Sequence, residues 1–328
     1  MQTHNASQPA SAARGAPEIL VLSKLEPAAA MAELSARFTC YNAFESPGLE
    51  TLIAAHGATI RGLVTTGGRG ADAQLIDSLP ALELITVYGV GVDAIDFATV
   101  RRRGIKVTNT PDVLTDDVAD LAIGLFLAAA RLIAAGDRAV RAGQWAKPLQ
   151  SRLPHSARGR KAGIVGMGRI GKAIANRLAV FDAEIAYCKS QPASGVGYRY
   201  FADPVSLAAH CDVLFVAVPG GERTFRMIDD KVLDALGPGG LLVNVSRGSV
   251  VDEIALVAAL ESGRLGAAAL DVFADEPNVP PALRGLDNVV LTPHIGSFTH
   301  ETRLAMGQLV VQNADAYFSG HALLTRVE

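Results

Sequence analysis

The sequence predicts an α/β protein with two Rossmann-like, doubly wound domains, each built on a parallel sheet, with a cleft between them. Short apolar runs alternate with helical patterns in two blocks, from Glu18 to about Asn109 and again from Lys161. Strand, helix and strand at this spacing are typical of a parallel sheet. A glycine-rich turn opens the second block, where such folds bind dinucleotides. The length of 328 residues also suits two domains.

The first block contains four apolar runs short enough for strands, together with four helical patterns. The expected strands are Ile19–Leu22, Ile60–Val64, Leu84–Val87 and Ile105–Val107, and the expected helices centre on Ala28–Arg37, Gly48–Ala55, Asp72–Ser78 and Ala94–Arg102. A last helix is expected from about Thr299 to Tyr317. We therefore expect a substrate-binding domain of residues 18–112 plus 298–328, with the cofactor domain inserted into it.

A long helix is expected to follow, from near Leu114 to about Gly143, with Thr115 or Asp116 available as its cap. It contains the longest apolar stretch of the chain, which includes two charged residues, Asp120 and Arg131. A membrane-spanning helix needs about 20 nearly uncharged residues. We therefore expect a buried helix and no membrane partner.

The second block, after a polar connector over residues 143–160, contains six further apolar runs. The expected strands are Ala162–Val165, Glu184–Tyr187, Asp212–Val218, Leu241–Val245, Ala267–Asp271 and Val289–Leu291, and the clearest helices are Arg169–Phe181 and Asp252–Ser262. Six strands with helical crossovers match a doubly wound dinucleotide fold. Residues 113–297 are therefore the expected dinucleotide-binding domain.

The composition excludes several classes of protein. At 49% hydrophobic residues the chain can bury a large core, and a net charge of −3 gives no reason to expect nucleic acid or an anionic membrane as a partner. The three cysteines, Cys40, Cys188 and Cys211, have neither a disulfide pattern nor metal-ligand spacing, so we expect a reducing cytoplasm and no metal. Residues 1–17 lack the apolar core of a signal peptide and are expected to form a flexible tail.

The glycine-rich turn reads Gly166-Met167-Gly168-Arg169-Ile170-Gly171, directly after an expected strand and before an expected helix. In this context Gly166 permits a tight turn, Gly168 lets the backbone approach a pyrophosphate, and Gly171 allows close packing of helix on strand. The start of the helix attracts the phosphate charge. The whole loop, including Arg169 and Ile170, is a candidate cofactor site, and a turn without a ligand is the alternative.

The end of the next strand bears on which nicotinamide cofactor is bound. An acid that holds a ribose 2′-hydroxyl is expected about 20 residues after the glycines. The sequence there is Tyr187-Cys188-Lys189-Ser190-Gln191, without an acid. Lys189 and Ser190 could hold a 2′-phosphate by charge and hydrogen bond. NADP(H) is therefore favoured, with NAD(H) open if Lys189 is only a solvated loop residue.

Three candidate catalytic residues follow later strands. Arg247 presents a planar fork that suits a carboxylate and an adjacent keto oxygen. His294 offers a proton near neutral pH, and Glu276 would pair with it and raise its pKa. Singly, such an arginine is more often a surface residue and such a histidine more often structural. Their joint occurrence after a phosphate-binding turn favours catalysis.

Two further positions carry open alternatives. Asp271 ends its strand, where it could accept a hydrogen bond from a nicotinamide carboxamide or merely cap the following turn. In the first block, Tyr88-Gly89-Val90-Gly91-Val92-Asp93 follows a strand. Its small residues expose backbone N–H groups that suit an anion, so a substrate carboxylate could dock on Val90 and Gly91. The alternative is an ordinary turn between strand and helix.

Taken together, these motifs resemble the D-isomer-specific 2-hydroxyacid dehydrogenase family over nearly the whole chain from Glu18. The segments that carry the resemblance are Gly166–Gly171, Val245–Gly248, Leu270–Phe273 with Glu276-Pro277, and Thr292–Gly296. In the first half, Val87–Asp93 and Val107–Thr115 look like the glyoxylate/hydroxypyruvate reductase branch, which includes enzymes acting on hydroxyphenylpyruvate.

The resemblance implies a role for each candidate residue. Arg247 binds substrate, His294 is the acid/base and Glu276 tunes it; Val90 and Gly91 hold the carboxylate, and Asp271 and Thr115 contact the nicotinamide side of the cofactor. The family is typically a homodimer built through the long helix, here about residues 114–143. NADP-preferring members of the branch usually carry an arginine near the position of Ser190, which this chain lacks.

We therefore expect NAD(P)H-dependent reduction of a small 2-keto acid to the D-2-hydroxy acid, with the hydride from nicotinamide and the proton from His294. Glyoxylate, hydroxypyruvate and hydroxyphenylpyruvate are the candidate substrates. A phosphoglycerate dehydrogenase or another D-2-hydroxyacid dehydrogenase is the alternative within the family. A nucleotide-sensing corepressor, which binds NAD(H) and peptides with little turnover, is the alternative outside catalysis.

Overall fold

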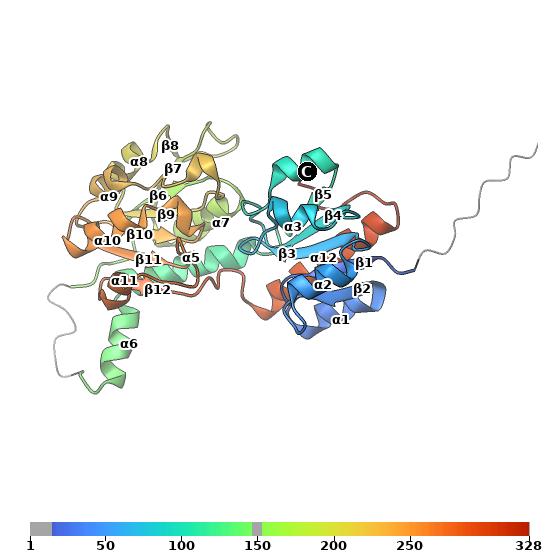
Figure 1. Cartoon of the computed structure of the whole chain (residues 1–328). Helices are drawn as coiled ribbons and strands as arrows, with labels where there is room; N and C mark the ends of the chain where they lie inside the picture. The colour runs from blue at the N-terminus through green and yellow to red at the C-terminus, as the bar shows by residue number, and fades with distance from the viewer. Residues whose placement is uncertain (1–14, 146–152, 328) are drawn as a thin grey trace, which may run out of the picture. The chain divides into compact units, whose positions relative to one another are not determined.

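The computed structural model of the chain describes residues 15–145 and 153–327 (Figure 1). They form two compact units, one from the described parts of Met1–Pro111 and Arg303–Glu328, the other from Asp112–Thr302. Each unit has its own parallel sheet, which confirms the predicted fold class. Most of the tail expected over residues 1–17, and residues 146–152 of the expected connector, lie outside the described residues.

The first unit has a five-stranded parallel sheet in the order β2-β1-β3-β4-β5, an order common among doubly wound folds. The four predicted strands and four predicted helices are present with bounds that differ by a few residues. The elements are β1 (Glu18–Val21), α1 (Ala28–Arg37), β2 (Thr39–Asn42), α2 (Leu49–His56), β3 (Gly62–Thr66), α3 (Ala73–Asp77), β4 (Leu84–Tyr88), α4 (Phe97–Arg103) and β5 (Lys106–Thr108).

The second unit has a seven-stranded parallel sheet in the order β12-β11-β10-β9-β6-β7-β8, the Rossmann order with β12 added at one edge. Its strands are β6 (Lys161–Val165), β7 (Glu184–Cys188), β8 (Arg199–Phe201), β9 (Val213–Val216), β10 (Leu241–Asn244), β11 (Ala267–Leu270) and β12 (Val289–Leu291). Its crossover helices are α7 (Arg169–Leu178), α8 (Pro204–His210), α9 (Asp230–Leu236), α10 (Glu253–Glu261) and α11 (Pro281–Gly285), with short 3₁₀ turns η1 (Ala179–Phe181), η2 (Glu222–Thr224) and η3 (Gly248–Val250).

Two strands, β2 and β8, were not predicted from the sequence. Both lie at the edge of their sheet. Their residues are exposed or half-buried, whereas the central strands β4 and β10 are buried throughout. Because an edge strand needs fewer apolar residues, neither segment has the apolar run that reveals a strand in the sequence.

The single long helix predicted over residues 114–143 is wrong, because the segment folds as α5 (Thr115–Ala130) and α6 (Ile133–Arg141), bent by 63°. Leu132 takes a left-handed backbone conformation, φ 57°, which interrupts the helical hydrogen bonds. The predicted cap is also wrong. Leu114 occupies the cap position without a side-chain bond, and Asp116 pairs with Arg177 on α7 instead.

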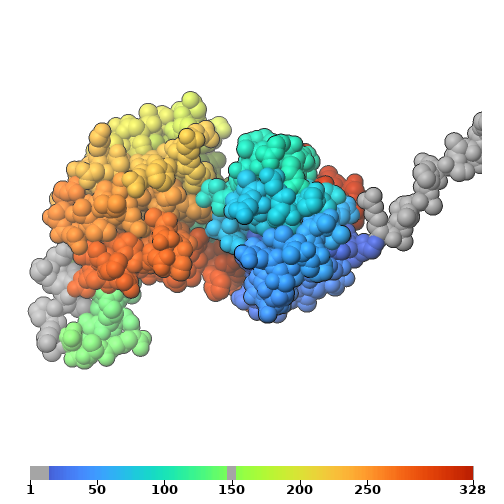
Figure 2. Space-filling view, in the orientation of Figure 1, coloured from blue at the N-terminus to red at the C-terminus, as the bar shows by residue number. Residues whose placement is uncertain are grey.

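The two helices have different surroundings. Six residues of α5 are buried, whereas α6 has none and stands out from the surface of its unit, as Figure 2 shows in green. No single helix among the described residues is long and apolar enough to span a membrane. Only the bent pair α5 and α6 together meets that criterion of length and composition.

Aspartate caps explain where many helices begin. In each case the carboxylate accepts the N–H group three residues later, which satisfies a donor that the helix leaves without a partner. The caps are Asp72 for α3, Asp96 for α4, Asp203 for α8, Asp229 for α9 and Asp252 for α10. The last helix, α12 (His300–Phe318), follows the loop that carries His294.

Candidate active site

The three candidate catalytic residues follow three neighbouring strands of the second unit. Strands β10, β11 and β12 are adjacent and parallel, with Asn244 in register with Leu270 and Leu270 with Leu291. Arg247, Glu276 and His294 lie beyond those strand ends. Because the carboxyl ends of neighbouring parallel strands share one edge of a sheet, the fold delivers all three side chains to that edge.

His294 and Glu276 form a direct pair. The distance from His294 Nδ1 to Glu276 Oε2 is 2.7 Å, and the other carboxylate oxygen accepts the Phe273 N–H at 3.1 Å. The side chains are 42% and 34% exposed, so the pair is open to solvent. With Nδ1 facing the carboxylate, the Nε2 atom is the one available for proton transfer.

The charge of Glu276 depends on this pairing. Burial raises the pKa of Glu276, but the hydrogen bond to His294, the charge of His294, the Phe273 N–H and the charge of Arg247 together outweigh it. The net result is a pKa below the ordinary value of 4.5. Glu276 is therefore a carboxylate at neutral pH, able to stabilise a protonated imidazole.

Replacing Glu276 by Gln is expected to flatten the acid side of the stability profile. A carboxyl group with a depressed folded-state pKa stabilises the fold above its unfolded pKa, near 4.5, and this contribution is lost as the pH falls through the lower folded value. The free energy of unfolding should therefore fall more steeply below about pH 4.5 in the wild type than in Glu276→Gln. Denaturant unfolding between neutral pH and about pH 3 measures this.

The matched control for this prediction is Glu261→Gln, a change to an exposed carboxylate at the end of α10. This variant should keep the wild-type dependence on pH. Identical acid slopes for the wild type and Glu276→Gln would contradict the assigned coupling between Glu276 and His294.

Asp271 braces the loop that carries His294. Its buried carboxylate accepts the Thr292 hydroxyl at 2.6 Å, the Ile295 N–H at 2.9 Å and the Gly296 N–H at 2.9 Å. Its backbone carbonyl accepts the His294 N–H at 2.8 Å. His294 has a left-handed backbone, φ 53°, which is sparsely populated for such a residue and is held by bonds on both sides. Burial raises the pKa of Asp271, and these hydrogen bonds oppose the rise.

Asn244 braces the turn that carries Arg247. Its buried side chain accepts the Ser246 N–H at 3.0 Å and the Ser246 hydroxyl at 2.7 Å, and it donates to the Arg247 carbonyl at 3.0 Å. The turn also packs tightly on its neighbour, because a Cβ at Gly248 would lie 1.8 Å from the carbonyl carbon of Phe273. The Arg247 guanidinium donates to the Ser246 carbonyl at 2.7 Å.

Sequence reasoning missed Asn244 and Thr292 as supporting residues. Asn244 had a visible signal, since a polar side chain ends the otherwise apolar strand Leu241-Leu242-Val243. A buried polar group of this kind needs hydrogen-bond partners, and here the partners are the turn that carries Arg247. Thr292 had no comparable signal, because its partner Asp271 is distant in sequence.

The glycine turn has the geometry that a dinucleotide phosphate needs. Gly166 has φ 102°, and a Cβ there would lie 2.5 Å from the Ala217 carbonyl oxygen. A Cβ at Gly171 would lie 2.0 Å from the Gly166 carbonyl oxygen, whereas one at Gly168 would meet nothing within 4 Å. Gly168 caps α7 without a side-chain bond, so the helix start is open to an anion. The residues therefore fit a pyrophosphate.

The segment that contains Thr115 lies beside this turn. Arg169, in the first turn of α7, pairs with Asp112 at 2.6 Å, and both side chains are about two-thirds exposed. The Thr115 N–H donates to the Asp112 carbonyl at 3.0 Å. Ile170 follows Arg169 and is half-buried. Asp112 thus links the start of α5 to the start of α7.

Lys189 and Ser190 begin the loop after β7, where both are exposed. The Gly166 N–H donates to the Cys188 carbonyl at 2.9 Å, so this loop starts next to the glycine turn. Burial, together with the charge of Asp203, raises the pKa of Cys188 to about 11. The strand therefore ends in a neutral thiol, followed by a cation.

Val90 and Gly91 lie in the first unit, after β4. The Thr110 N–H donates to the Gly89 carbonyl and the Asn109 amide donates to the Val90 carbonyl, each at 2.9 Å. Within the described parts of that unit, the N–H groups of Val90 and Gly91 have no hydrogen-bond acceptor. The carbonyl groups of the loop are thus bound by Thr110 and Asn109, and the N–H groups of Val90 and Gly91 remain available to an anion.

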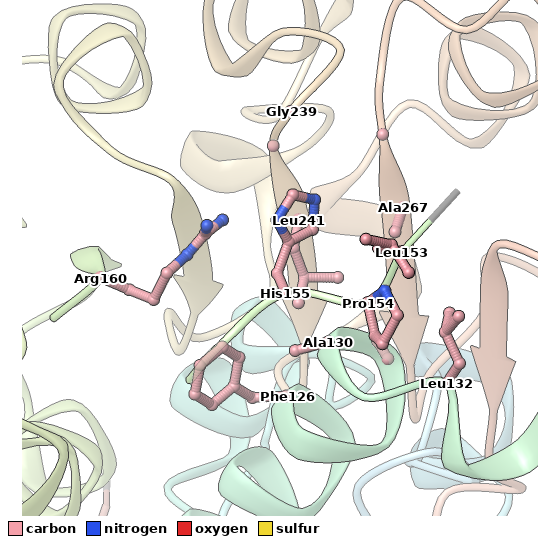
Figure 3. Close-up of a pocket in the computed structure, with 13 residues that line it drawn as sticks. Phe126, Ala130, Leu132, Leu153, Pro154, His155, Arg160, Gly239, Leu241 and Ala267 are labelled. Carbon is pink, nitrogen blue, oxygen red and sulfur yellow. The ribbon is translucent and has the colours of Figure 1, made fainter. Parts of the chain in front are cut away.

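The pocket drawn in Figure 3 lies elsewhere in the second unit. It is lined by Leu241 and Ala267, the first residues of β10 and β11, with Phe126, Arg160 and His155 around them. It is therefore at the amino ends of these strands, whereas Arg247, Glu276 and His294 follow the carboxyl ends. Ligands of doubly wound folds bind at carboxyl ends, so the three candidate catalytic residues do not belong to this pocket.

A doubly wound sheet that combines an open phosphate turn with an arginine and a glutamate–histidine pair at one edge defines a class, the nicotinamide-dependent oxidoreductases. The profile of the D-isomer specific 2-hydroxyacid dehydrogenase NAD-binding domain matches residues 123–296. The chain belongs to the D-isomer specific 2-hydroxyacid dehydrogenase family, which confirms the resemblance seen in the sequence.

Relatives of known activity support the same branch of the family. The chain is 50% identical to glyoxylate/hydroxypyruvate reductase A of Arabidopsis thaliana and 48% identical to hydroxyphenylpyruvate reductase of Plectranthus scutellarioides, in each case over 90% of this chain and 94% of the relative. Among solved structures, the NADPH-dependent glyoxylate/hydroxypyruvate reductase of Sinorhizobium meliloti in complex with NADP and malonate is 42% identical, with a TM-score of 0.89 over 95% of this chain and 97% of that one.

Proposed function

We propose that the protein reduces a small 2-keto acid to the D-2-hydroxy acid with NAD(P)H, with glyoxylate and hydroxypyruvate as first candidates and hydroxyphenylpyruvate as a further one. The observation that carries this proposal is the 2.7 Å pair of His294 and Glu276, which shares one sheet edge with Arg247. The activities named for the relatives support the same substrates.

Each residue has a proposed role in the reaction. A bound nicotinamide supplies the hydride. Arg247 binds the carboxylate and the keto oxygen of the substrate and stabilises the charge that develops on that oxygen. His294 donates a proton to the keto oxygen from Nε2, while Glu276 holds the ring through Nδ1.

The remaining candidate residues have binding roles. Residues 113–297 bind the cofactor, with Asp271 and Thr115 on its nicotinamide side. Residues 18–112 and 298–328 bind the substrate, with its carboxylate on Val90 and Gly91. The fit of the glycine turn to a pyrophosphate and the free N–H groups of the Val90 loop support this division.

The test is oxidation of NADPH and NADH with glyoxylate, hydroxypyruvate and hydroxyphenylpyruvate. We expect turnover of at least one of the three at a rate well above background. Phosphohydroxypyruvate is assayed as a fourth compound, and a clear preference for it would favour a phosphoglycerate dehydrogenase. Cofactor binding without reduction of any small 2-keto acid would overturn the catalytic proposal in favour of a nucleotide-sensing binding protein.

We propose NADP(H) as the preferred cofactor, held at its 2′-phosphate by Lys189 and Ser190. The neutral Cys188 thiol, the absence of a carboxylate at residues 187–191 and the NADP complex of the Sinorhizobium relative support this choice. Replacing Lys189 by Glu should raise the KM for NADPH by about 10- to 100-fold, because a charged hydrogen bond is lost and a like charge faces the phosphate. The KM for NADH should change far less.

Steady-state kinetics with both cofactors measure this effect. Lys231→Glu, which makes the same change of charge at an exposed residue of α9, should leave both KM values unchanged. A strong wild-type preference for NADH, or equal effects of Lys189→Glu on the two cofactors, would refute the assignment.

We further propose a homodimer formed through α5 and α6. Helix α6 has no buried residue, and Ile133 and Val140 are 56% and 52% exposed on it. A nine-residue helix with no buried residue is marginal in water, so a second copy of this chain is expected to cover it. Trp145 adds a large exposed apolar side chain just beyond the helix.

The variant Ile133→Lys/Val140→Lys is expected to shift the protein from dimer to monomer, because it places two charges in the proposed interface. Sedimentation velocity measures the shift. Val180→Lys, a change at an exposed apolar residue of η1, should leave the dimer intact. A monomeric wild type would refute the proposal.

We propose that the protein works in a reducing, cytoplasmic compartment, and the state of its cysteines agrees with this location. All three are free thiols. Burial is the main cause that raises the pKa of Cys211 to about 12, with contributions from the charges of Asp212 and Glu184, so this thiol has little tendency to react.

A further inference from the structure

Two tyrosines flank the loop that carries Lys189. Tyr187 on β7 and Tyr200 on β8 are partners in the register of these parallel strands. Their ring centroids are 5.6 Å apart, with a tilt of 57° between the planes. Partner residues on neighbouring strands point to the same face of a sheet, so both rings stand on one side beneath the loop.

Both hydroxyl groups bind the loop backbone. The Tyr187 hydroxyl accepts the Ala193 N–H at 2.9 Å, and the Tyr200 hydroxyl donates to the Lys189 carbonyl at 3.3 Å. The loop is thus tied at its first residue and again near its middle. Tyr187 is 2% exposed, so the hydrogen bond that holds Ala193 comes from a side chain fixed in the core.

The composition of the loop makes such anchors necessary. Residues 190–197 include two serines, two glycines and an alanine, which leave a chain with many backbone conformations. Fixing the backbone of each residue costs conformational entropy. A loop that is already held in the free protein binds a ligand without that cost, which raises affinity by pre-organisation.

We propose that Tyr187 and Tyr200 are positioning residues for cofactor selectivity, which hold Lys189 where it meets the 2′-phosphate of NADP(H). The inference rests on the proposed preference for NADP(H). It assigns to the tyrosines an effect on NADP(H) alone, because the segment after the second strand of such a fold meets the ribose 2′ position, whereas the glycine turn meets the pyrophosphate shared by both cofactors.

Tyr187→Phe and Tyr200→Phe keep the paired rings and remove one hydroxyl each. We expect each to weaken binding of NADPH and of 2′,5′-ADP by about two- to tenfold, the effect of one neutral hydrogen bond. Binding of NADH and 5′-ADP, and kcat at saturating NADPH, should stay at wild-type values. Tyr198→Phe, in the same loop and without a hydroxyl contact in the described structure, is the matched control.

A double-mutant cycle separates positioning from general support of the fold. If the tyrosines act through Lys189, Tyr200→Phe should cause no further loss of 2′,5′-ADP affinity once Lys189 is replaced by Ala. Thermal unfolding of each variant identifies any loss of stability. Tyr200 is only partly buried, so its variant keeps the test valid if Tyr187→Phe unfolds.

The outcomes distinguish the two proposals. Equal wild-type affinity for 2′,5′-ADP and 5′-ADP would refute the NADP(H) preference, and the positioning role with it. A wild type that prefers 2′,5′-ADP, with tyrosine variants that match Tyr198→Phe or weaken both nucleotides equally, would overturn the positioning role alone. The positioning role would also be overturned if Tyr200→Phe weakened binding of 2′,5′-ADP as much in the Lys189→Ala background as in the wild type.

Discussion

Replacing His294 by Ala is expected to lower kcat for 2-keto acid reduction by about 10²- to 10⁴-fold, the usual contribution of a positioned general acid. The variant loses the imidazole that Glu276 holds at 2.7 Å, and with it the proposed proton donor. Affinity for NADPH should be retained, because the glycine turn follows β6, which is not adjacent to β12. Steady-state kinetics and cofactor titration measure the two quantities.

His300→Ala is the control, since it removes an exposed imidazole only a few residues away, at the start of α12. It should leave kcat near the wild-type value. Turnover that survives in His294→Ala would show that the proton comes from another group. Loss of both turnover and cofactor binding would indicate a damaged fold rather than a missing acid.

Replacing Arg247 by Leu is expected to lower kcat/KM for the 2-keto acid by about 10²- to 10³-fold or more, the loss found when one group that stabilises an oxyanion is removed. Arg247→Lys should recover only part of the rate, because an ammonium group lacks the planar fork that binds two oxygens at once. The turn itself should persist, since Asn244 holds it through the backbone of Arg247.

The measurement is kcat and KM for the keto acid at saturating NADPH, with Arg284→Leu, a change at an exposed residue of α11, as the control. If Arg247→Leu left both parameters unchanged, Arg247 would be a structural residue. If Arg247→Lys matched the wild type, a point charge would suffice and the two-oxygen contact would be wrong.

Most of the fold was predictable because its signals are local. The central strands of both sheets are short apolar runs, and the aspartates that begin helices lie directly before them. The two edge strands, β2 and β8, were not predicted, because an edge strand needs no continuous apolar run. The break between α5 and α6 was not predicted either. Leu132 is a good helix former, and its left-handed backbone arises from its surroundings.

The candidate site residues could be predicted from sequence, because each follows a strand in a fold whose ligands bind at strand ends. The sequence could not establish which strands are neighbours. The adjacency of β10, β11 and β12 brings Arg247, Glu276 and His294 to one edge, and it depends on long-range pairing.

The amino-acid sequence by itself determined which chemical groups the candidate site contains, namely the glycine turn, the Arg247 cation, the Glu276 carboxylate and the His294 imidazole. Only the tertiary structure decided how these groups are held. Asp271 reaches Gly296, and Tyr200 reaches the carbonyl of Lys189, through hydrogen bonds between segments far apart in the chain or on neighbouring strands. Such bonds form only after the strands have paired, so no local pattern of residues predicts them.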